Sequence, residues 1–142
     1  MAFVRWEEKY RLGINPLDEQ HQQLFDIINK LHDAMLREKS KKVVGELLKK
    51  LMEGTALHFS DEEIHMEQNA YPGYAAHKKE HHDLAKQMTE VVSNFNGGKT
   101  ELSTPVMYFL KDWLYKHIVQ TDLPYTSYLI DKGVLIKRRT LR

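Results

Sequence analysis

The sequence contains no cysteine, which excludes disulfide bonds, zinc–thiolate sites and iron–sulfur clusters. Its 142 residues carry a formal net charge of +1, so neither nucleic acid nor an anionic membrane surface is expected as a partner. No apolar run is long enough to span a bilayer, and the charged first residues do not resemble a signal peptide. We therefore expect a cytoplasmic chain without a membrane span.

Apolar residues recur at offsets of three and four in four segments, and this spacing predicts four amphipathic helices. The predicted helices cover about residues 19–37, 41–69, 75–95 and 104–122. Asp18 is expected to cap the first helix. Pro124 is expected to limit the last one, because proline disfavours the α region for the residue before it. The core-facing stripe of the third helix is expected to include Val91.

Short connections between successive helices favour an up-down-up-down arrangement. We therefore predict an all-α four-helix bundle that forms a single domain of residues 1–142. The bundle itself is assigned to residues 18–122. An irregular N-terminal arm (residues 1–17) precedes it and a short C-terminal segment (residues 123–142) follows it.

Histidine is abundant, and five of the eight histidines fall on the expected core faces together with two acidic residues. Two pairs at a spacing of four residues each lie on one face of a helix. Antiparallel helices rise equally per residue, so side chains at equal distances from a turn lie at equal height. Imidazole and bridging carboxylate suit iron or another first-row metal. The predicted metal ligands are His21, His58, Glu62, His77, His81, His117 and Asp122.

Asp122 fits this set only with a local distortion. It follows His117 by five residues, which in a regular α-helix turns it well off that face. We therefore expect a π-bulge or a loosened last turn here. Taken alone, each motif has a plainer interpretation, such as a hydrogen-bonded core histidine or a solvated ion pair. Together they make those interpretations weak, because burying so many ionisable groups without a metal would cost several kcal/mol.

The other histidines provide a comparison. His32 falls too deep in the bundle to join the site, and His82 faces away from the stripe and should be exposed. His65 is the one spare histidine that could compete as a ligand. Glu63 and Glu80 are interpreted as solvated or as neighbours of the ligands.

The ligand motifs also resemble those of the hemerythrin family, and bacterial single-domain hemerythrins in particular. The segments that carry the resemblance are Leu17-Asp-Glu-Gln-His21, His58-Phe-Ser-Asp-Glu62, His77-x-x-x-His81 and Trp113-Leu-x-x-His117-Ile-x-x-x-Asp122. The resemblance runs from Trp6 to about Tyr128. It implies two iron ions (Fe2+/Fe3+) with an oxo or hydroxo bridge, and reversible binding of dioxygen by a carrier, store or sensor that is not an enzyme.

The resemblance also implies a division of the ligands. One iron would be held by His77, His81 and His117. The other would be held by His21 and His58 and keep an open position, and both carboxylates would bridge. The implied wall of the dioxygen pocket consists of Phe59, Trp113, Leu114, Ile118 and Tyr125. Leu123-Pro124 departs from the family pattern, in which a basic residue is more usual, and this leaves the fourth side of the pocket open to question.

Other functions remain as alternatives. The same centre could perform peroxide or nitric oxide chemistry, or the chain could be an oxygen-responsive interaction module. Carboxylate-rich diiron proteins use two Glu-x-x-His motifs. Glu62 and His65 have that spacing, but no second copy lies in register on another helix. With no signalling domain attached, a free-standing carrier is favoured, and any oxygen-using client protein is unknown.

Overall fold

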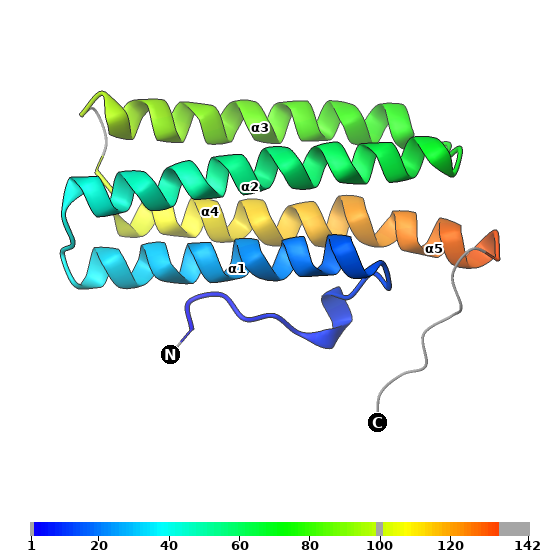
Figure 1. Ribbon diagram of the computed structural model, residues 1–142, viewed down its shortest axis with the longest axis horizontal. Helices are drawn as coiled ribbons and strands as arrows, with labels where there is room; N and C mark the ends of the chain where they lie inside the picture. The colour runs from blue at the N-terminus through cyan, green and yellow to red at the C-terminus, as the bar shows by residue number, and fades with distance from the viewer. Residues whose placement is uncertain (1, 99–100, 134–142) are drawn as a thin grey trace.

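The computed structural model describes residues 2–98 and 101–133. Four long helices form a bundle in which each helix runs antiparallel to the one before it (Figure 1). They are α1 (Asn15–Leu36), α2 (Lys41–Gln68), α3 (Tyr74–Asn96) and α4 (Thr104–Lys116). Beyond α4 the chain continues in the same direction through the π-helix η2 (His117–Asp122) into α5 (Leu123–Asp131) (Figure 1). The predicted all-α four-helix bundle is confirmed, with no strand in these two ranges.

The start of α1 differs from the prediction. The helix begins at Asn15 and not at Glu19, with Pro16 in its first turn, where the missing N–H costs nothing. Asp18 is therefore not the cap but a buried residue inside the helix. Its carboxylate accepts hydrogen bonds from the backbone N–H groups of Leu12 (2.7 Å) and Gly13 (3.0 Å). This contact ties the N-terminal arm to the bundle.

The arm contains one short 3-10 helix, η1 (Glu8–Tyr10), and lies along α1 (Figure 1). Asn29 of α1 holds it by two hydrogen bonds to one residue: its side-chain oxygen accepts from the Val4 N–H, and its side-chain nitrogen donates to the Val4 carbonyl. The ring centroids of Trp6 and His21 are 6.4 Å apart. The arm thus covers the side of the bundle next to one predicted ligand.

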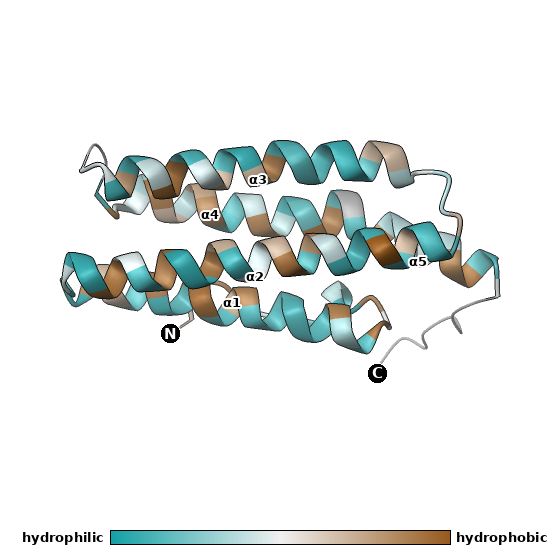
Figure 2. Ribbon diagram, turned by 45° about the horizontal axis from the view of Figure 1, so that its top comes forward, coloured by the Kyte–Doolittle hydropathy of each residue, from teal (hydrophilic) through white to brown (hydrophobic). Residues whose placement is uncertain are grey.

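Two apolar clusters fill the interior. The larger one occupies most of the bundle, and the outward side of α3 is largely hydrophilic (Figure 2). Of the two neighbouring valines of α3, Val92 is buried and not Val91 as predicted. Both follow buried Met88 at helical spacing, and it is Val92 that packs in the larger cluster. The smaller cluster consists of Leu12, Ile14, Leu17, Met66, Tyr125 and Leu129. In α1 the predicted ligand His21 lies between Leu17 of the smaller cluster and Leu24 of the larger one. In α2 Glu62 lies between Phe59 of the larger cluster and Met66 of the smaller one.

Pro124 does not end the helical chain as predicted. Leu123 keeps helical angles (φ −61°, ψ −39°) although a proline follows it. Pro124 lies in the first turn of α5, the one place in a helix where a missing N–H leaves no hydrogen bond unmade. Residues 134–142 of the predicted C-terminal segment lie outside the described residues. Among the helices of the described chain, none is long and apolar enough to cross a membrane.

Candidate metal centre

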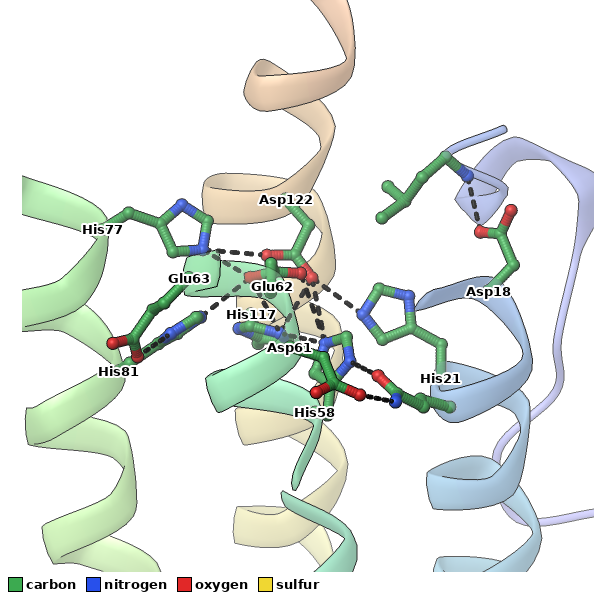
Figure 3. A network of polar contacts seen from close by, with 12 residues as sticks. Asp18, His21, His58, Asp61, Glu62, Glu63, His77, His81, His117 and Asp122 are labelled. Atoms are coloured by element: carbon green, nitrogen blue, oxygen red, sulfur yellow. Dashed lines mark hydrogen bonds and ion pairs between the residues drawn. The ribbon is translucent and has the colours of Figure 1, made fainter. Parts of the chain in front are cut away.

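The seven predicted ligands come together near one end of the bundle (Figure 3). Each is at most 5% exposed, so solvent contributes almost nothing to their surroundings. They come from four directions: α1, α2, α3, and the π-helix that follows α4. The π-helix places Asp122 on the same side as His117, since residues five apart lie about one turn apart when the hydrogen bonds run from i to i+5. The expected distortion is therefore present.

Each carboxylate faces imidazoles from two sides. Asp122 directs Oδ2 to His21 Nε2 (2.7 Å) and Oδ1 to His77 Nε2 (3.0 Å). Glu62 directs Oε1 to His81 Nε2 (2.9 Å) and Oε2 to His58 Nε2 (3.3 Å). Both carboxylates therefore present one oxygen to the His21/His58 side and the other to the His77/His81 side. This is the arrangement that a bridging carboxylate needs between two metal ions.

The ring of His117 lies between the two groups of histidines. Its centroid is 5.2 Å from that of His58 and 5.2 Å from that of His81. Its Nε2 atom lies 3.0 Å from His58 Nε2 and 2.8 Å from Asp122 Oδ2. By ligand-atom distances it groups with His21 and His58, whereas the sequence resemblance assigns it to His77 and His81. The division of ligands between two metal ions thus stays a prediction.

Burial shifts the pKa values of this cluster strongly. Desolvation lowers the pKa of His58 to about 3 and that of His81 to about 2, and it also lowers the pKa of His117. Desolvation and the charge of Asp122 raise the pKa of Glu62 well above 4.5. Burial alone would raise the pKa of Asp122 too, but His117 and the hydrogen bonds from the surrounding imidazoles lower it well below 3.8. Burial therefore keeps His58, His81 and His117 neutral, which is the form of an imidazole that binds a metal.

Two polar atoms of the cluster are not satisfied by their neighbours. Glu62 Oε2 and His21 Nδ1 are buried and have no hydrogen-bond partner. Such groups are costly to bury unless something else binds them. Five imidazoles around two carboxylates match the ligand preference of a first-row metal, so the residues fit a metal centre.

The five predicted pocket residues are all buried. Phe59 stacks on His81 with ring centroids 3.9 Å apart, and Trp113 lies nearly parallel to His117 at 6.4 Å. Leu114 and Ile118 are fully buried in the larger apolar cluster. Tyr125 belongs to the smaller cluster, and its hydroxyl is hydrogen-bonded to His65. The pocket role of these five residues remains a prediction.

Hydrogen bonds on the outer side of the ligand rings include residues that the sequence did not single out. His58 Nδ1 donates to the Gln20 side-chain oxygen (2.9 Å), and the Gln20 amide donates to Asp61 (2.7 Å). His81 Nδ1 donates to Glu63 Oε2 (2.9 Å), so Glu63 is a neighbour of a predicted ligand (Figure 3). Gln20 directly precedes His21, and Asp61 follows His58 by three residues, but these spacings alone gave no reason to pair Gln20 with His58.

The spare histidines are placed elsewhere. His82 is exposed as predicted. His32 stacks on Phe3 with ring centroids 4.2 Å apart, on the arm and away from the site. His65 does not join the cluster, because its ring nitrogen is engaged by Tyr125. Each of the five histidines nearest the two carboxylates is therefore one of the five predicted ligands.

The arrangement is that of a metal-binding four-helix-bundle protein, with ligands from facing helices and a bridging position for each carboxylate. Residues 12–127 match the hemerythrin HHE cation binding domain. Because this match covers most of the sequence, the chain belongs to the hemerythrin family.

Curated relatives and a solved structure agree with this assignment. A bacteriohemerythrin of Methylococcus capsulatus is 32% identical over 126 residues, which is 88% of this chain and 95% of the relative. A myohemerythrin of Sipunculus nudus is 34% identical over 125 residues, covering 87% of this chain and 92% of that protein. The crystal structure of a wild-type hemerythrin matches with a TM-score of 0.82 at 31% identity, covering 89% of this chain and 97% of that one.

Proposed function

We propose that this chain binds dioxygen reversibly at a pair of iron ions. The observation that carries the proposal is the buried set of five imidazoles around two carboxylates, each of which faces both sides of the cluster. His77, His81 and His117 would hold one ion, and His21 and His58 the other, beneath the bridging carboxylates. When bound, the iron pair would supply two electrons to dioxygen and recover them on release.

The surrounding chain would protect this chemistry from water and protons. Leu114 and Ile118 are fully buried, and Phe59 covers the face of His81 at 3.9 Å. The smaller apolar cluster, with Leu17 and Met66, lies on the opposite side of the ligand layer. A dry environment slows the proton entry that would turn reversible binding into irreversible oxidation.

The nitrogen-rich ligand set favours a binding protein over an enzyme. Carboxylate-rich diiron sites contain four Glu side chains and two histidines, whereas this cluster has five histidines and two carboxylates. His65 would be needed for a Glu-x-x-His motif, but its ring nitrogen is hydrogen-bonded to Tyr125. We therefore expect a carrier, store or sensor.

The test is the visible spectrum of the iron-loaded, reduced protein before and after exposure to air. We expect about two irons per chain and an absorption band that appears with dioxygen and disappears on degassing. Asp122→Ala should lose the band together with paired iron, and the exposed His82→Ala should keep both. One tightly bound zinc without iron would contradict the metal assignment. Continuous oxygen consumption with a reductant would instead show an enzyme.

A further inference from the structure

The outer ring nitrogens of the buried histidines have unequal partners. His81 Nδ1 donates to the carboxylate of Glu63 at 2.9 Å. His58 Nδ1 donates to the neutral amide oxygen of Gln20, also at 2.9 Å. His21 Nδ1 is buried and has no partner. On the α3 side of the cluster, the outer nitrogen of His81 therefore has a carboxylate as its hydrogen-bond partner. On the other side, His58 has an amide partner and His21 has no hydrogen-bond partner.

These partners determine how much electron density each ring gives to a metal. An imidazole that donates its outer N–H to a carboxylate is a more basic ligand than one that donates to an amide. The same hydrogen bond fixes the neutral tautomer and leaves Nε2 directed at the centre. A metal ion bound to the more basic ring is easier to oxidise, since that ring stabilises the higher charge.

Glu63 is placed to keep this role. It is on α2, one residue after Glu62, and its side chain is 20% exposed. It lines a surface groove between α2 and α3 together with Lys78. Partial burial raises the pKa of Glu63, and the charge of Lys78 opposes this rise. Glu63 therefore contacts solvent on one side and the buried ring of His81 on the other.

The hydrogen-bond partner of His58 is a neutral amide, whose orientation is fixed by Asp61. The Gln20 amide donates to Asp61 Oδ2 at 2.7 Å, and this bond fixes its oxygen towards His58. An inverted amide would present N–H to an N–H and lose both contacts. Asp61 thus holds Gln20 in the orientation of a neutral acceptor for His58.

We propose that Glu63 and the Gln20–Asp61 pair are positioning residues that make the two metal positions electronically unequal, so that the ion on the His77/His81 side is oxidised first. The inference rests on the proposed diiron function. It concerns residues outside the ligand set, which touch neither the metal position nor dioxygen.

The test is spectroelectrochemistry of the iron-loaded protein, which yields two one-electron midpoint potentials. Glu63→Gln keeps a hydrogen-bond acceptor but removes its charge, and we expect it to raise the lower potential and leave the higher one nearly unchanged. The effect on that equilibrium should be about tenfold, or about 59 mV for one electron. Glu67→Gln is the matched control. Glu67 is exposed in the same groove one turn away, and its change alters net charge equally.

A second variant tests the other side of the cluster. Gln20→Glu combined with Asp61→Asn exchanges amide and carboxylate at constant net charge. The double variant should lower the higher potential, whereas Glu63→Gln should raise the lower one. Both changes should narrow the gap between the two midpoint potentials. Paramagnetically shifted Nδ1–H signals in the reduced protein identify the affected ring: that of His81 should move in Glu63→Gln, and that of His58 in the double variant.

The outcomes separate this inference from the proposed function. If the wild-type chain binds fewer than two irons or shows no reversible band, the proposed function fails. If it binds both but Glu63→Gln moves both potentials together, as Glu67→Gln does, only the inference is overturned. A wider gap in either positioning variant would overturn it as well.

Discussion

Acid should unfold the metal-free protein at a pH that leaves most helical bundles intact. Burial lowers the pKa of His58 to about 3 and that of His81 to about 2, from 6.5 in an exposed imidazole. Both rings stay neutral in the folded protein at a pH where the unfolded chain has bound a proton on each. Their contribution to stability is therefore complete above 6.5 and is lost as the pH falls towards the folded values.

The magnitude follows from the number of protons taken up. Each of these imidazoles lowers the free energy of unfolding by about 1.4 kcal/mol for every pH unit below its unfolded pKa. At about pH 5, His58 and His81 together therefore lower it by roughly 4 kcal/mol. Burial lowers the pKa of His117, which adds to the loss. Burial raises the pKa of Glu62, which opposes it, since the folded protein holds a proton that the unfolded chain releases. The net loss should remain on the order of 4 kcal/mol, a large part of the stability of a small domain.

Urea unfolding of the metal-free protein, followed by circular dichroism at several values between about pH 7.5 and about pH 5, measures this loss. His58→Gln should reduce the pH dependence by about one proton, whatever it does to stability at neutral pH. His82→Gln, at an exposed position, should keep the wild-type dependence. A free energy of unfolding that changes by less than about 1 kcal/mol over this range would refute the argument that the rings are held neutral by burial.

Four further outcomes are expected. Leu114→Ala should lower stability by roughly 2–5 kcal/mol in urea unfolding, because the side chain is fully buried. The iron content of Leu114→Ala should stay unchanged, while its oxygenated absorption band should decay faster than that of the wild-type protein. Asp122→Ala should bind fewer than two irons by metal analysis, and His82→Ala should bind as wild type does. Asp18→Ala should cost roughly 1–3 kcal/mol, because two buried N–H groups lose their acceptor, and Asp18→Asn should cost less. Iron binding should raise the melting temperature, and equal melting with and without metal would place the site outside the cooperative core.

Much of the site could be predicted because helix geometry converts sequence spacing into height. His21 and His58 are about equally distant from the first turn, and Glu62 and His77 from the second, so their convergence needed only antiparallel helices with short connections. The four-helix bundle followed from the same apolar stripes. The prediction for Val91 was wrong by one residue. Val91 and Val92 both lie near the apolar stripe, and side-chain packing decides which of them is buried.

Contacts that depend on side-chain conformation could not be predicted. Gln20 lies on α1 next to the predicted ligand His21. No spacing rule indicates that the Gln20 amide would turn to His58 on α2. The position of His117 between the two groups depends on ring orientation, which sequence periodicity does not contain. Asp18 was assigned to a cap because Pro16 and Gly13 resemble helix breakers. Pro16 is instead compatible with a first turn, and Gly13 has a positive φ of 91°.

The π-helix and Pro124 explain one another. A regular α-helix through His117 would turn Asp122 away from the cluster, and the second carboxylate would be lost from it. The wider turn brings Asp122 to 2.8 Å from His117 Nε2, and it interrupts the α-helical hydrogen-bond pattern just before Pro124. A proline inside a continuous helix would cost about 3 kcal/mol, but at the start of a new α-helical stretch it costs little. Pro124, which was predicted to limit the fourth helix, is therefore tolerated because the turn before it is widened, and that widened turn supplies the predicted ligand Asp122.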